Sequence, residues 1–271
     1  MLEAFHMREK SHLIVTGTAR SGTTALTHLL NAHEQVCVGI ERFKFRYLLE
    51  NDYSPEFLSR ARFFRFEEAD TNQLPARRPM LRDVYRTMEQ KWDTARVVGD
   101  KVPDMAPILE DFLEQNPDFK CIYILRNIKD VALSWQRRAD RPRDRWPRAK
   151  GFAAACTRWE EHTRIFHDML ARGRHRSRIL VLDHDAIYTP EAKTVLAIRA
   201  FLDLEPSTAF TEAWHKNMEF VAARREQERG IPRQHLKAYR ATDGQYGRLL
   251  RKYARTSLPL WAERLAPETG C

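Results

Sequence analysis

Short apolar runs alternate with longer amphipathic stretches along the chain. The runs are rich in Val, Ile and Leu and have the length of buried strands, while the stretches between them have helical length and spacing. The predicted strands are His12 to Thr16, Val36 to Val38, Arg96 to Val98, Phe119 to Leu125 and Arg178 to Leu182. The clearest predicted helices are Pro79 to Trp92, Asp104 to Gln115 and Gly151 to Arg172. This alternation predicts an α/β fold in three layers, a central parallel sheet flanked by helices, with right-handed crossovers.

A glycine-containing loop follows the first predicted strand. Gly17 and Gly22 keep the spacing of the triphosphate-binding loop G-x-x-x-x-G-K-[ST], but Thr23 stands at the position of its lysine. Leucines at helical spacing follow the loop, so the loop leads into a helix N-terminus. Unpaired N–H groups and the helix dipole attract an anion there. The sequence therefore predicts a P-loop-like anion site that is unsuited to ATP hydrolysis.

The side chains of this loop sharpen the prediction. Arg20 lies inside the loop, and hydroxyl groups are supplied by Ser21, Thr23 and Thr24 beside Gly22. An arginine fork suits an anionic group whose several oxygens are held in a fixed orientation. The alternative is a plain strand-to-helix turn in which the hydroxyls only cap the helix.

A second junction of a strand and a helix has the same character. The apolar run that ends at Leu125 is followed at once by Arg126 and a helical stretch in which Ser134 lies about two turns further on. Ligands of parallel α/β sheets collect at the carboxyl ends of the strands. Two anion sites at one edge predict a ligand with two separated anionic ends.

These two elements resemble the sulfotransferases that use 3′-phosphoadenosine 5′-phosphosulfate (PAPS). The R-S-G-T-T form of residues 20–24 is similar to that of bacterial, tyrosylprotein and carbohydrate sulfotransferases, and residues 126–134 are similar to R-N-P-K-D-V-A-x-S, with Ile128 replacing the proline. The resemblance implies that residues 20–24 hold the 5′-phosphosulfate, and that Arg126 and Ser134 hold the 3′-phosphate. It also implies an enzyme that transfers a sulfuryl group to a hydroxyl of a small molecule or carbohydrate and releases 3′-phosphoadenosine 5′-phosphate (PAP).

Two further segments resemble catalytic positions of the family. The stretch from Asn31 to Glu41 is similar to D-A-H-P-D-V…G-E-E of tyrosylprotein sulfotransferases, which implies Glu41 as the catalytic base after a one-residue adjustment of register, because the gapless match falls on Ile40. The alternative for Glu41 is a carboxylate in the first turn of a helix. The D-K-V-P segment at residues 100–103 resembles the E-K-T-P segment of heparan-type enzymes, which implies that Lys101 stabilises charge on the bridging oxygen. A surface lysine beside a turn is the alternative.

Length and composition bear on the domain organisation and on the partners of the protein. The 271 residues suit one sulfotransferase domain, with a helical insertion expected at 51–95 and a basic loop and helix region at 222–271. The formal net charge is +9, and the densest basic cluster, residues 137–148, either faces an acidic acceptor or is a solvated loop. Its interspersed aspartates argue against nucleic acid as a partner. A homodimer is left open.

The cysteines, the acidic residues and the apolar runs bear on metal binding and on the location of the protein in the cell. The four cysteines lack the spacing of zinc ligands, and no acidic motif of the magnesium-holding kind accompanies the loop, so no metal is expected. The sequence has no run of 18 apolar residues and no apolar leader, so a cytoplasmic enzyme without a membrane span is expected. The alternative is an enzyme from which a membrane anchor has been removed. Two other classes stay open: a P-loop kinase of small metabolites and a non-catalytic module that binds polyanions.

Overall fold

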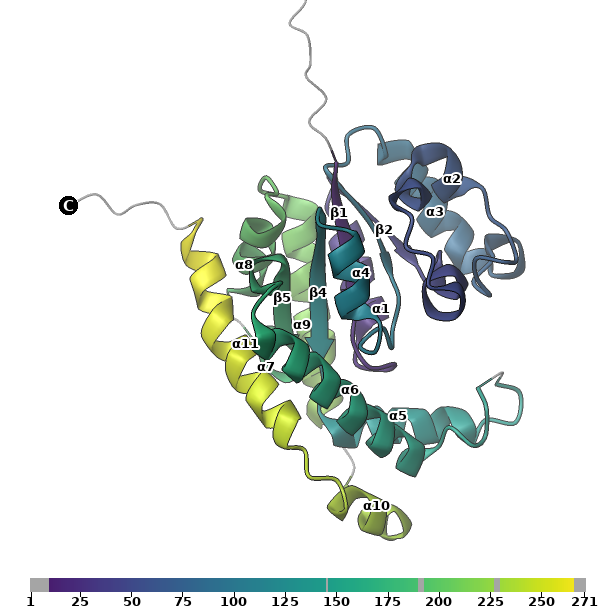
Figure 1. The fold of residues 1–271 in the computed structure, drawn as a ribbon, viewed down its shortest axis with the longest axis vertical. Helices are drawn as coiled ribbons and strands as arrows, with labels where there is room; N and C mark the ends of the chain where they lie inside the picture. The colour runs from purple at the N-terminus through teal and green to yellow at the C-terminus, as the bar shows by residue number, and fades with distance from the viewer. Residues whose placement is uncertain (1–9, 145, 190–192, 227–229, 266–271) are drawn as a thin grey trace, which may run out of the picture.

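A five-stranded parallel sheet forms the centre of the computed structural model, which describes residues 10–144, 146–189, 193–226 and 230–265 (Figure 1). The strand order is β2-β3-β1-β4-β5, and all neighbouring strands are parallel. The strands are β1 (Ser11–Thr16), β2 (Val36–Ile40), β3 (Val97–Lys101), β4 (Phe119–Leu125) and β5 (Ile179–Asp183). The predicted parallel α/β sheet is therefore confirmed.

Helices connect the strands and continue beyond the last one. The α-helices within the sheet-forming part are α1 (Thr23–Asn31), α2 (Arg60–Phe64), α3 (Pro79–Lys91), α4 (Leu109–Gln115), α5 (Ile128–Ala139) and α6 (Phe152–Arg172). Those after β5 are α7 (His184–Ile187), α8 (Thr194–Leu202), α9 (Thr208–Glu226), α10 (Leu236–Arg240) and α11 (Gln245–Glu263). Arg145 of the basic cluster, and residues 227–229 and 266–271 of the expected C-terminal basic region, lie outside the described residues. Within the described segments, no helix combines the length and apolar character that a bilayer crossing requires.

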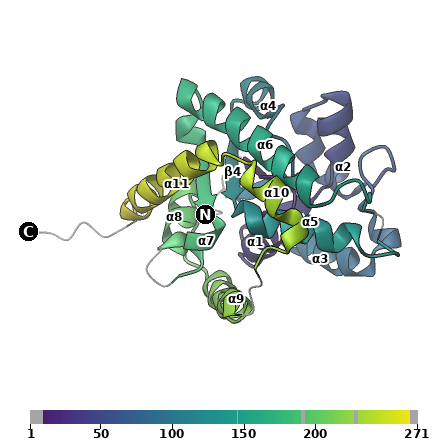
Figure 2. The ribbon, with the colours of Figure 1, turned by 90° about the horizontal axis from the view of Figure 1, so that it is seen from below.

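The sheet separates two hydrophobic cores. Alternate residues of β1 point to opposite faces: Ile14 packs in one core, and Leu13 and Val15 pack in the other. The first core includes residues of α3, α4, α5 and α6, and the second includes residues of α1, α8 and α9. Figure 1 shows α4 in front of the sheet and α8 and α9 behind it, and the view from below in Figure 2 shows α4 and α6 on the opposite side of β4 from α9. These two helical layers and the sheet are the three predicted layers.

Three element ends differ from the predictions by more than one residue. Strands β2 and β3 run on to Ile40 and Lys101. The residues added to β3, Asp100 and Lys101, are polar but stay buried, because they hydrogen-bond or pair with residues 41–43. The helix predicted from Asp104 begins only at Leu109. Asp104 has a left-handed backbone with φ 66°, a conformation that no helix interior accepts.

A buried ion-pair network supports the segment after β2. Arg42 is fully buried, and its guanidinium donates to Asp70 Oδ2 (2.7 Å) and to the carbonyl of Phe63 (2.8 Å). Arg46 and Arg62 contact the other carboxylate oxygen of Asp70. Burial would raise the pKa of Asp70, but hydrogen bonds from Arg62, Arg42 and Arg46 outweigh it and lower the pKa to about 2. This network fixes the chain directly after Glu41.

Candidate functional site

The anion loop, residues 17–22, joins β1 to α1 at the carboxyl edge of the sheet. Its backbone takes conformations that favour glycine, with φ 152° at Gly17 and 103° at Gly22, and Arg20 also has a positive φ of 76°. A Cβ at Gly17 would lie 2.3 Å from the carbonyl oxygen of Ile124, so only glycine fits there. The N-cap of α1 is Gly22, which has no side chain, and the hydroxyl of Ser21 has no hydrogen-bond partner in the described chain, which does not fit the plain capping alternative.

Two buried hydroxyls in and beside the anion loop lack a hydrogen-bond partner in the described chain. The side-chain oxygens of Thr16 and Ser21 are buried and have no hydrogen-bond partner among the described residues. Buried polar groups are usually paired, so unpaired ones near a loop rich in N–H donors fit a bound anion.

Two residues to which the sequence analysis gave no role hold the loop in place. Asp104 Oδ1 accepts from the N–H of Ala19 (2.8 Å), and the N–H of Asp104 donates to the carbonyl of Gly17 (2.9 Å). Trp135 Nε1 donates to the carbonyl of Ala19 (2.8 Å). The position of Asp104 just past a strand end was an available signal, whereas nothing local to Trp135 indicates its contact.

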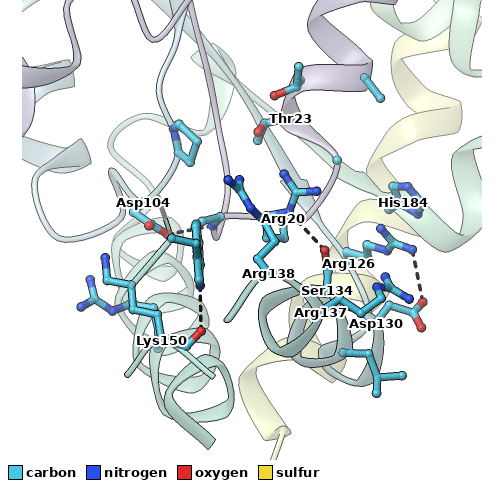
Figure 3. Close-up of a pocket in the computed structure, with 18 of the residues that line it drawn as sticks. Arg20, Thr23, Asp104, Arg126, Asp130, Ser134, Arg137, Arg138, Lys150 and His184 are labelled. Atoms are coloured by element: carbon cyan, nitrogen blue, oxygen red, sulfur yellow. Dashed lines mark hydrogen bonds and ion pairs between the residues drawn. The ribbon is translucent and has the colours of Figure 1, made fainter. Parts of the chain in front are cut away.

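The two predicted anion sites meet. Strands β1 and β4 are neighbours, and Thr16 pairs with Tyr123, so the residues after both strands emerge side by side. Arg20 Nε donates to Ser134 Oγ over 3.1 Å, which links the anion loop to α5 (Figure 3). Arg126 Nη2 lies 3.6 Å from Asp130 Oδ2, and Arg126 Nε is buried with no hydrogen-bond partner in the described chain. The guanidinium of Arg126 therefore keeps a donor for a further anion.

Glu41 directly follows β2 and lies between Lys101, the last residue of β3, and Lys44. Its Oε1 is 3.0 Å from Lys101 Nζ, and its Oε2 is 2.8 Å from Lys44 Nζ. Burial alone would raise the pKa of Glu41, but the charges and hydrogen bonds of Lys101 and Lys44 lower it to about 2. Glu41 has φ 56° and precedes a turn, so it is not the first-turn helix carboxylate of the alternative. Lys101 is fully buried as the last residue of β3, so it is not a surface lysine.

Asp100 shapes the turn that carries Glu41. The buried carboxylate accepts from the N–H groups of Arg42 (2.9 Å) and Phe43 (2.8 Å), the two residues that follow Glu41. Burial raises the pKa of Asp100 to about 6, although these hydrogen bonds oppose the shift. Asp100 is thus a positioning residue for Glu41.

One large cavity connects these groups. It has a volume of about 1270 Å³, and the described residues that line it include eight lysines and arginines but four aspartates and glutamates, so anions are favoured. The predicted site residues that line it are Arg20, Gly22, Thr23, Thr24, Glu41, Arg126 and Ser134. Ser21 and Lys101 are buried behind this surface. Figure 3 shows Arg20 of the anion loop, Arg126 at the end of β4 and Ser134 of α5 converging.

His184 and Asp185 border the cavity from the end of β5. A Cβ at Gly22 would lie 2.7 Å from His184 Cδ2, so the imidazole packs closely on the end of the anion loop. Asp185 forms an ion pair with Arg251 of α11 (3.3 Å). Both contacts are typical of residues that hold neighbouring segments in place.

A metal-capable group exists elsewhere in the described chain. Ligand atoms of Glu110, Glu114 and His175 lie within 4.8 Å of one another. These residues do not line the cavity in the described segments, and Arg172 and Arg174 pair with Glu110. This cluster is therefore separate from the candidate site.

The ion pairs of Glu41 predict an acid-dependent loss of stability. With a pKa of about 2 in the folded protein against an ordinary value of 4.5, ionised Glu41 stabilises the fold above pH 4.5, and this contribution is lost as the pH falls through 2. The shift corresponds to about 3 kcal/mol of unfolding free energy. Urea unfolding at several pH values is expected to show a difference between wild type and Glu41→Gln that shrinks with falling pH. A difference independent of pH would contradict this assignment.

Comparisons with known proteins show the family to which this chain belongs. A family model described as "Sulfotransferase family" matches residues 12–210, a range that contains the anion loop, Glu41, Lys101, Arg126 and Ser134. No curated protein matches the chain. The sulfotransferase domain of the Synechococcus PCC 7002 olefin synthase is 17% identical at a TM-score of 0.50, with 91% of this chain and 95% of that chain covered.

Two other solved structures have similar folds. The sulfotransferase from Alicyclobacillus acidocaldarius is 15% identical at a TM-score of 0.50, with 93% of this chain and 98% of that chain covered. Mouse sulfotransferase SULT7A1, solved in complex with PAP, is 12% identical at a TM-score of 0.52, with 90% and 89% covered. At these identities the similarity extends to the fold alone.

Proposed function

Because this chain belongs to the sulfotransferase family, we propose that it transfers a sulfuryl group from PAPS to a hydroxyl group of a small-molecule or carbohydrate acceptor. The observation that carries the proposal is the meeting of two anion-binding groups in one cavity, linked by the hydrogen bond from Arg20 to Ser134. A ligand with phosphate at 3′ and phosphosulfate at 5′ has the two anionic ends that this arrangement requires.

The side chains present fit this donor. The anion loop offers N–H groups at the start of α1, and the unpaired hydroxyl of Ser21 adds a donor close to them. Arg20, Ser21, Gly22, Thr23 and Thr24 are assigned to the 5′-phosphosulfate. Arg126, with its unpaired buried Nε, and Ser134 are assigned to the 3′-phosphate.

Glu41 and Lys101 are assigned catalytic roles in the transfer of the sulfuryl group. PAPS supplies an activated sulfuryl group, and Glu41 takes the proton of the attacking acceptor hydroxyl, a role that contributes about 10² to 10⁴-fold in rate. Lys101 and Arg20 stabilise the charge that develops on the bridging oxygen. These fixed charges stabilise the developing negative charge, as a metal ion does in phosphoryl transfer. Transfer without a metal ion is therefore part of the proposal.

The ion pairs of Glu41 suggest how the base becomes active. A carboxylate with a pKa of about 2 is a weak base while it is bound by both lysines. When Lys101 Nζ turns to the donor, Glu41 loses one of its two partners and its pKa rises towards the ordinary value. The base then strengthens only in the loaded enzyme.

Calorimetric titration with PAP and with ATP–Mg²⁺ tests this function. We expect PAP to bind in the presence of EDTA and Arg126→Ala to weaken that binding by about 10 to 100-fold, since charge-assisted hydrogen bonds to the phosphate are lost. Arg86→Ala, which removes an exposed arginine paired with Asp83, is the matched control and is expected to leave PAP binding unchanged. Binding of ATP–Mg²⁺ without binding of PAP would reject the proposal in favour of a kinase.

A further inference from the structure

A second group of cations lines the cavity outside the anion loop and Arg126. This basic wall comes from the segment before α3, the end of α5, the segment that follows it, and α6. Its members are Arg78, Arg137, Arg138, Lys150 and Arg158. Figure 3 labels three of them, Arg137, Arg138 and Lys150, around the same cavity as Arg20 and Ser134.

The basic wall is only partly neutralised. Arg138 pairs with Asp144 through two nitrogens, and Arg158 lies 3.8 Å from Glu161. In the described part of the chain, neither Arg78 nor Lys150 has a carboxylate oxygen within 4.0 Å. An excess of positive charge therefore faces the cavity.

Aromatic contacts tie the basic wall to the anion loop. The Trp146 ring lies under Arg138 (5.1 Å) and Lys150 (5.8 Å), and its Nε1 donates to the carbonyl of Lys150 (2.8 Å). Trp146 also packs edge-on against Trp135 at 4.9 Å, and Trp135 donates to the carbonyl of Ala19. The wall is thus a built part of the site.

The basic wall also reaches the candidate base. The pKa of Arg138 is raised first by its hydrogen bond with Asp144 and also by the charge of Glu41, so the guanidinium is within electrostatic reach of that carboxylate. An adjoining hollow of about 590 Å³ is also lined by Arg78 and Arg138, and its other charged lining residues are Arg141, Arg143 and Asp144. Positive charge therefore extends from Glu41 outward.

We infer that the acceptor is itself an anion, with a carboxylate, phosphate or sulfate group that the basic wall binds while its hydroxyl lies at Glu41. This inference rests on the proposed sulfuryl transfer, which already assigns the two anionic ends of the donor to the anion loop and to Arg126 with Ser134. The basic wall has no part in either assignment, so its positive charge is available to another anion. Arg78 and Lys150 are the specificity-determining residues, because neither is occupied by a carboxylate of the described chain.

Matched sugar probes test the inference. The protein saturated with PAP is titrated at low ionic strength with p-nitrophenyl β-D-glucoside, the corresponding glucuronide, and the glucoside 6-phosphate. We expect one or both charged probes to bind at least about tenfold more tightly than the neutral one, as for hydrogen bonds to charged groups. The stronger of the two identifies the anion that the wall prefers.

Paired charge variants supply the control. The double variant Arg78→Gln/Lys150→Gln is expected to remove most of the preference for the charged probes and to leave PAP affinity unchanged. Arg60→Gln/Arg86→Gln removes the same net charge from exposed positions elsewhere and is expected to keep the preference. Equal binding of neutral and charged probes by wild type, or an intact preference in the first variant, overturns the inference. Failure of PAP itself to bind would reject the proposed function separately.

Discussion

Glu41→Gln is expected to lower the turnover number by about 10² to 10⁴-fold, the contribution of a positioned general base. Glutamine has nearly the same shape but cannot accept the proton of the acceptor hydroxyl. The affinity for PAP is expected to change little, because the residues assigned to its two ends are Arg20 to Thr24, Arg126 and Ser134. Transfer of labelled sulfuryl groups from saturating PAPS, together with PAP titration, measures both quantities.

Two controls separate chemistry from folding. Glu68→Gln makes the same substitution at an exposed glutamate paired with Arg77 and is expected to retain full turnover. Because Glu41 also stabilises the fold, circular dichroism at the assay temperature has to show that the Glu41→Gln protein is folded. Full turnover in a folded Glu41→Gln protein would reject Glu41 as the base.

Asp70→Asn is expected to lower the free energy of unfolding by about 3 to 5 kcal/mol, because it leaves a buried arginine without its countercharge. Arg42 is fully buried against this carboxylate, which is itself fully buried. For a domain of this size the loss corresponds to a fall in Tm of about 10 °C. Urea unfolding at neutral pH measures the change.

The exposed pair of Arg60 and Asp93 provides the comparison for Asp70. Its side chains are 48% and 74% exposed, and exposed pairs contribute less than about 1 kcal/mol, so Asp93→Asn is expected to have a small effect. Equal losses of unfolding free energy in the two variants would show that the buried Arg42 network contributes no more to stability than an exposed ion pair.

The fold was largely predictable because its strands are continuous apolar runs. The runs at β1, β4 and β5 have clear limits in the sequence, and the predicted positions differ from the structure by no more than one residue at either end. The end of β3 was missed because Asp100 and Lys101 are polar yet buried. Their burial depends on hydrogen bonds and an ion pair from residues 41–43, which no local pattern reveals.

The candidate site was predictable in part. That Arg20 and Ser134 lie together follows from two loops at the same edge of a parallel sheet. The roles given to Glu41, Lys101 and the other site residues stay predictions. The contact between Trp135 and the loop, the left-handed turn at Asp104 and the convergence of Arg78 with Lys150 depend on tertiary packing across distant segments.

Helix α5 carries residues of the sites proposed for both substrates. It carries Ser134 beside the anion loop and Arg138 one turn later in the basic wall, so a small rotation of this one helix displaces contacts to the donor and to the acceptor together. Under the proposed function, the first substrate to bind fixes the position of α5. The second substrate then binds without spending free energy on fixing the helix. Thermodynamic reciprocity then requires each substrate to raise the affinity for its companion by the same factor. The helix would make cooperativity between two different substrates a property of a single chain.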